Sequence, residues 1–98
     1  MADDGDDAHR ELRRVVDRLR SMPLTRLGLH AVAARVLAQD LADRGADLAG
    51  HQRYVVPDVG DSAVGDQVAV TGRDLLVLTG PGDTQWLAGR LRDFRLDL

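Results

Sequence analysis

Apolar residues recur at spacings of three and four, without a break, through residues 24–48. These positions are Leu24, Leu27, Ala31, Ala34, Ala38, Leu41, Gly45 and Leu48. Such spacing is typical of the face that one α-helix packs against another. Because the middle of this seam is alanine, a neighbouring helix backbone can come close. Further apolar residues widen the stripe, so we expect a central helix that touches more than one partner: Leu29, Val32, Val36 and Leu37. Two glycines could end this helix, Gly45 and Gly50. We expect the helix to end at Gly50, since a glycine in left-handed conformation commonly follows a helix end.

Two more helices are predicted, one on each side of this segment. The first places Leu12, Val15, Val16, Leu19 and Met22 at helical spacing and is interrupted by Pro23. The last is predicted to be capped by Asp83 or Thr84 and to bury Leu87, Leu91, Phe94 and Leu98, with Trp86 packed against the bundle.

The segment 62–79 has two interpretations. As a helix capped by Asp61 or Ser62, it would align Val64, Val68, Leu75 and Leu78, with Thr71 between them. As a β-hairpin over 67–78, it would turn at Gly72. Each glycine inside a helix costs about 1 kcal/mol relative to alanine. We favour the helix because the same spacing runs through the other segments.

These elements predict an all-α fold, a small antiparallel bundle of about four helices with an extended connection near 50–60. The alternative is an α+β fold with a hairpin at 67–78 packed on three helices. The 98 residues suffice for one domain. We expect a mobile acidic tail over 1–7 and a single helical domain over 8–98.

The stretch 57–78 has the glycine spacing of a phosphate-binding loop. Gly60 and Gly65 fit, but Asp66 and Gln67 occupy the places of the lysine and the hydroxyl residue that bind phosphate and Mg²⁺. A carboxylate there would repel phosphate. The acids of this stretch also lack the pattern of a calcium loop, so we interpret them as turn and cap residues.

The histidines, serines and acids form no catalytic or metal-binding pattern. His9, His30 and His51 have no metal-ligand spacing, and the chain has no cysteine. The two serines, Ser21 and Ser62, stand beside helix boundaries. Asp74 is the acid of most interest because it interrupts an apolar helix side, and we expect it to pair with an arginine at the rim. The sequence thus predicts no enzyme, no cofactor and no metal site.

All 13 basic residues are arginine, and five of them are spread over the first helix. A possible polyanion contact comprises Arg10, Arg13, Arg14 and Arg18. The net charge of −3 disfavours a nucleic-acid partner for the domain as a whole.

The sequence therefore predicts a cytoplasmic, non-enzymatic interaction or scaffold protein. Its expected partner is a second copy of itself, in a dimer, or another protein. No association with a membrane is expected. The possible interface is the small-residue seam: Leu27, Ala31, Ala34, Ala38 and Leu41. The alternative is a nucleic-acid-binding regulator that uses the arginine-rich first helix.

Overall fold

The structure is a computed structural model that describes residues 4–98. Its helices are α1 (Asp4–Ser21), α2 (Leu24–Ala49), α3 (Val64–Leu78) and α4 (Pro81–Leu96), with a short 3₁₀ turn, η1 (Asp61–Ala63), before α3. No strand occurs within that range. The predicted all-α fold of four helices is confirmed, and the hairpin alternative at 67–78 is wrong because that segment lies within α3.

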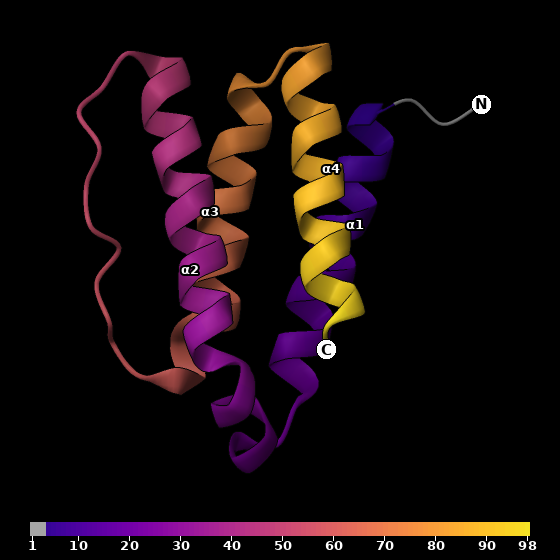
Figure 1. The fold of residues 1–98 in the computed structure, drawn as a ribbon, viewed down its shortest axis with the longest axis vertical. Coiled ribbons are helices and arrows are strands. Elements are labelled where there is room, and N and C mark those ends of the chain that lie inside the picture. Colours follow the sequence, from indigo (N-terminus) through magenta and orange to yellow (C-terminus); the bar gives the residue numbers. More distant parts are fainter. Residues whose placement is uncertain (1–3) are drawn as a thin grey trace.

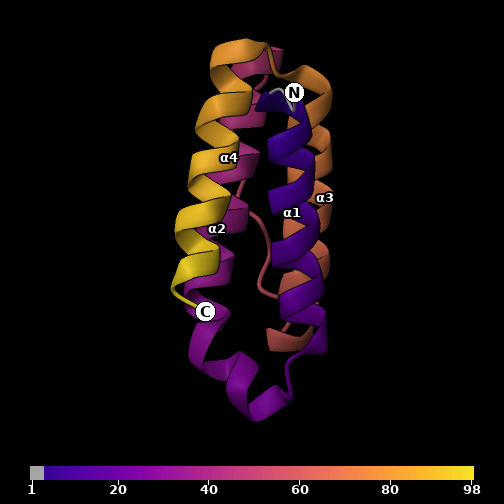
Figure 2. The same ribbon diagram turned by 90° about the vertical axis from the view of Figure 1, so that its right-hand side faces the viewer.

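The helices form two layers, α2 with α4 and α1 with α3 (Figures 1 and 2). The connection 51–60 runs back along the side of α2, as expected of a crossover, so α2 and α3 run in the same direction (Figure 1). Gly28 near the start of α2 accordingly faces Asp61, and Ala49 at its end shares a cavity with Leu78. The pair α1 and α4 runs opposite to the pair α2 and α3 (Figure 1).

Close approach to α1 explains why α3 tolerates two glycines. A Cβ atom at Gly72 would lie 2.5 Å from Cδ1 of Leu12, and one at Gly65 would lie 3.2 Å from Cγ of Arg20. Both glycines are buried, on the side of α3 that also buries Val68. The cost of glycine in the helix interior is therefore offset by packing of α1 directly against the α3 backbone.

The ends of the helices follow the sequence signals only in part. Gly50 ends α2 in the left-handed conformation, with φ of 71°, as predicted. In contrast, α1 begins at Asp4, so residues 4–7 of the predicted tail are helical, and residues 1–3 lie outside the described part. Acidic residues stabilise the positive end of the helix dipole, which favours this early start.

The predicted side-chain caps of the last two helices are wrong. Neither α3 nor α4 has a side-chain hydrogen bond at its N-cap. The η1 turn leads into α3, and α4 begins earlier than expected, at Pro81, where proline lacks only an amide donor that a helix start leaves unpaired. Trp86 packs partly buried against the core as predicted, and the Arg44 guanidinium lies 4.6 Å from its ring centre.

The side chain of Gln39 holds the connection to α2. Its Nε2 donates to the carbonyl oxygen of Tyr54, and its Oε1 accepts from the amide of Val56, both at 2.8 Å. From the other side, Nε2 of Gln67 donates to the carbonyl oxygen of Pro57 at 2.6 Å. The extended backbone of the connection thus finds its hydrogen-bond partners in side chains of the two helices that it joins.

Replacing Gln39 by leucine is expected to lower the free energy of unfolding by about 1–2 kcal/mol, because the two hydrogen bonds to the connection and a third to Asp43 are lost. The Gln85→Leu variant is the control, since Gln85 is exposed on α4 and its side chain makes no hydrogen bond to any of residues 4–98. Urea denaturation measures both changes. Equal stability of the two variants would contradict a fastening role for Gln39.

Candidate functional site

The five seam residues proposed as an interface lie inside the chain. Leu27, Ala31, Ala34, Ala38 and Leu41 all belong to the core cluster. They are covered by the chain's own helices, chiefly α3, so they offer no surface to a second molecule. The interface prediction requires correction on this point, because helical spacing predicts that a face is packed but not whether its partner lies in the same chain.

A second apolar face of α2 remains uncovered. Leu29, Val32 and Val36 are 82, 68 and 51% exposed, and the neighbouring Ala33 is also exposed. Their spacing of three and four puts them in one row on the side of α2 that points away from the core. We call these four residues the outer stripe. A row of large aliphatic side chains in water marks a candidate binding surface.

Charges of opposite sign stand at the two ends of the outer stripe. Arg26, at the N-terminal end, donates to the main-chain oxygen of Leu98 at 3.3 Å and has no acidic partner among residues 4–98. Asp40, at the other end, pairs with Arg90 of α4 at 2.9 Å. The outer face of α2 therefore runs from basic through aliphatic to acidic.

The arginines of α1 do not form one continuous strip. Arg14 and Arg18 line a hollow of about 580 Å³ with Asp17 and Arg95, next to α4. Arg13 instead lines a smaller hollow of about 160 Å³ on the α3 side. The proposed polyanion contact is thus divided between two sides of the helix.

Two of these arginines already have carboxylate partners. Arg10 lies 3.5 Å from Asp7, and Arg14 lies 3.5 Å from Glu11. Arg13 and Arg18 have no ion pair with any of residues 4–98. The nucleic-acid alternative stays a prediction, and the division of the strip together with these pairs weakens it.

Sequence reasoning missed the charged group on which the α1–α4 contact depends, Glu11. Its side chain is 5% exposed and accepts hydrogen bonds from Nε and Nη2 of Arg95 at 2.7 and 3.2 Å. The guanidinium of Arg92 lies 3.6 Å away. The hydrogen bond from Arg95 is the main cause that lowers the pKa of the Glu11 carboxyl, against the opposing effect of burial. One sequence signal could have indicated its burial: Glu11 stands one residue before Leu12, on the apolar face of the helix.

Three of the four acids in the stretch 57–78 lie beside arginines: Asp58, Asp61 and Asp66. Asp66 accepts from Arg20 at 2.7 Å, and Asp61 accepts from Arg35 at 3.0 Å. Asp58 accepts from the amide of Gly60, which forms a local turn. These contacts tie α3 and η1 to α1 and α2, which supports a structural interpretation of the stretch.

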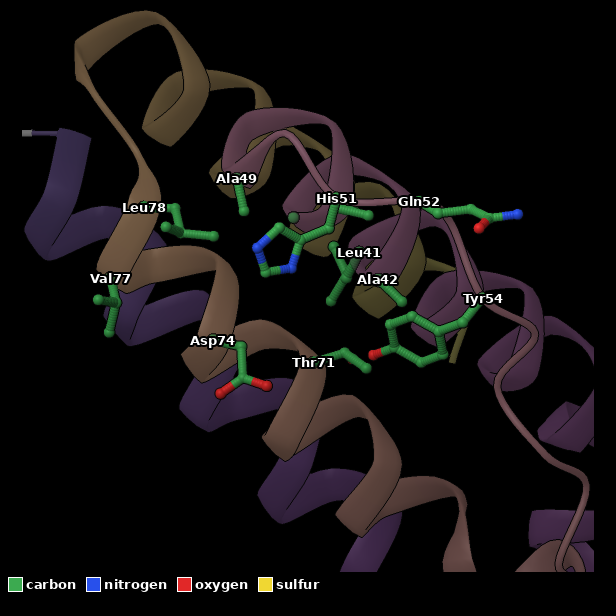
Figure 3. A pocket seen from close by; sticks show the side chains of 12 residues that line it. Leu41, Ala42, Ala49, His51, Gln52, Tyr54, Thr71, Asp74, Val77 and Leu78 are labelled. Carbon is green, nitrogen blue, oxygen red and sulfur yellow. The ribbon is translucent and has the colours of Figure 1, made fainter.

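Asp74 lies in a cavity of about 400 Å³ between α2, α3 and the start of the connection (Figure 3). The expectation that it pairs with an arginine is wrong for the described residues, where it makes neither an ion pair nor a hydrogen bond. His51 and Tyr54 enter the same cavity from the connection (Figure 3).

Residues 4–98 contain no group of three or more histidine, aspartate or glutamate side chains placed to hold a metal ion. None of the helices in that range is both long and apolar enough to span a membrane. Comparison with models of protein families, with curated proteins and with solved structures found no match.

Proposed function

We propose that the protein is a non-enzymatic helical interaction protein that pairs with a second copy of itself through the outer stripe of α2. One observation carries this proposal: a helix that already buries one face in its own core has a second, aliphatic face in water. Leaving such a row exposed has an unfavourable hydration free energy, which pairing removes.

The residues of the outer stripe are placed so that two copies fit in antiparallel orientation. A two-fold axis between Val32 and Ala33 would bring Leu29 of one copy opposite Val36 of the other. At 1.5 Å rise per residue, Leu29 and Val36 each lie about 5 Å from this axis along the helix. The alternation of large residues with Ala33 at the centre allows close approach of the two helices.

The charges at the ends of the stripe favour the same orientation. Along the helix, Arg26 lies about 10 Å and Asp40 about 11 Å from the axis, on opposite sides. Arg26 of each copy would therefore come opposite Asp40 of the other. The two helix dipoles would be antiparallel, which is the favourable orientation for neighbouring dipoles. A parallel pairing would instead place like charges together.

The exposed area of the outer stripe sets the expected strength of pairing. Four aliphatic side chains bury far less than the roughly 800 Å² per partner that is typical of stable complexes. We therefore expect a weak dimer whose population rises with protein concentration.

Replacing Val32 by glutamate is expected to abolish pairing, because two carboxylates would meet near the axis. The control is Val77→Glu, since Val77 is 86% exposed near the end of α3, on another helix than the stripe. Sedimentation equilibrium measures the molar mass of both variants and of the unsubstituted protein. Pairing of Val32→Glu as strong as that of Val77→Glu would contradict the proposed surface.

A further inference from the structure

The cavity at Asp74 combines an apolar lining with one charged group. Its exposed apolar walls include Ala49 of α2, Leu78 of α3 and the ring of Tyr54 from the connection. The carboxylate of Asp74 stands at one side, and the imidazole of His51 reaches in from the connection (Figure 3). The volume, about 400 Å³, lies within the range of small-molecule sites.

Asp74 differs from the other acids of the chain in its surroundings. Most carboxylates among residues 4–98 form an ion pair with an arginine, as Asp66 and Asp83 do. Asp17, Asp93 and Asp97 also lack an ion pair within that range, but Asp17 lines hollows together with arginines, and Asp93 and Asp97 line neither those hollows nor the cavity of Asp74. No arginine lines the cavity of Asp74, so its charge is uncompensated beside an apolar wall.

We propose that this cavity binds a small organic amine, with its ammonium group on the Asp74 carboxylate and its apolar body against Ala49, Tyr54 and Leu78. Charge determines this class of ligand: an anion would be repelled by Asp74, and a neutral apolar molecule would leave the carboxylate unpaired. An ammonium forms a charge-assisted hydrogen bond with such a carboxylate.

The site is independent of the outer stripe, because its residues come from the opposite half of α2 and from α3. The carboxylate is also within reach of solvent, since Asp74 is an exposed residue. Affinity is therefore expected to be modest, and recognition is expected to depend on the charge of the ligand more than on its shape.

A titration of the isotope-labelled full chain, followed by NMR, tests the proposal with two probes of equal shape. Phenethylamine carries a positive charge at pH 7, and 2-phenylethanol is neutral. We expect saturable shifts at the residues that line the cavity with the amine, and binding at least about tenfold weaker with the alcohol.

The Asp74→Asn variant is expected to weaken amine binding about tenfold and to leave alcohol binding unchanged. The Asp93→Asn variant is the control, because Asp93 is exposed on α4 and has no partner among residues 4–98. Three results would overturn the proposal: no saturation by the amine, shifts located elsewhere, or equal binding of amine to Asp74→Asn and Asp93→Asn.

Discussion

Replacing Glu11 by glutamine is expected to lower the free energy of unfolding by about 2–3 kcal/mol at pH 7. The neutral side chain would leave Arg95 and the nearby Arg92 without their buried anion. We place the effect below that of breaking a fully buried pair, because the guanidinium groups are partly in water, Arg95 at 30% and Arg92 at 48% exposure. Urea denaturation measures the change.

The Asp17→Asn variant is the control for this experiment, since Asp17 is exposed on the same helix and lacks an ion pair among residues 4–98. Its stability should stay within about 0.5 kcal/mol of that of the unsubstituted protein. A Glu11→Gln variant as stable as Asp17→Asn would show that the α1–α4 contact does not depend on this carboxylate.

Low pH is expected to remove the stabilisation that the Glu11 carboxylate provides. Its pKa is lower in the folded chain than the ordinary value of 4.5, mainly because Arg95 donates a hydrogen bond to the carboxylate. The stabilisation is thus complete above pH 4.5 and is lost as the pH falls through the folded pKa. The difference in stability between the protein and Glu11→Gln should therefore shrink below pH 4.5. A constant difference from pH 7 to pH 3 would contradict this cause.

Replacing Ala38 by leucine is expected to destabilise the protein by about 3 kcal/mol, because three carbon atoms must enter a closely packed core. Ala38 has no exposed surface. The matched control is Ala33→Leu on the outer stripe of the same helix. That variant should keep its stability within about 0.5 kcal/mol, since nothing covers the position in the single chain.

These two alanines also separate folding from association. Thermal denaturation and light scattering on both variants would show which face of α2 serves which purpose. We expect Ala38→Leu to lose stability and Ala33→Leu to pair less strongly at unchanged stability, because two leucines would meet at the axis where the small alanine side chains allow close approach. If Ala38→Leu lost pairing but kept full stability, the seam residues, and not the outer stripe, would be the interface.

The comparison of sequence with structure shows which information is local. The helices were predictable from spacing, since burial of one face leaves a period of three and four in the sequence. The spacing of apolar residues could not decide between a helix and a hairpin for the segment of α3. The glycine at position 72 is explained by its contact with Leu12 of another helix, which spacing does not reveal. Nor could spacing separate the two apolar faces of α2, because both have helical periodicity and only packing distinguishes them.

The charged contacts were beyond sequence reasoning for a similar reason. Glu11 and Arg95 are separated by 84 positions, and only the fold brings them together. The lack of an arginine near Asp74 was equally invisible, since it depends on where each of the arginines finds its carboxylate. The start of α4 at Pro81 was missed because this helix begins without a side-chain cap.

Cysteine cross-linking tests the central claim, antiparallel pairing through the outer stripe, most directly. The natural chain has no cysteine, so a Leu29→Cys chain mixed with a Val36→Cys chain can be oxidised without competing thiols. Residues 29 and 36 of different copies should meet, whereas two copies of residue 29 would stand about 10 Å apart along the helix. We predict that the mixed disulfide dimer clearly exceeds the half share of all dimers that random collision of equal amounts of the two chains would give. A share no greater than that half, or no covalent dimer at millimolar protein, would contradict the pairing.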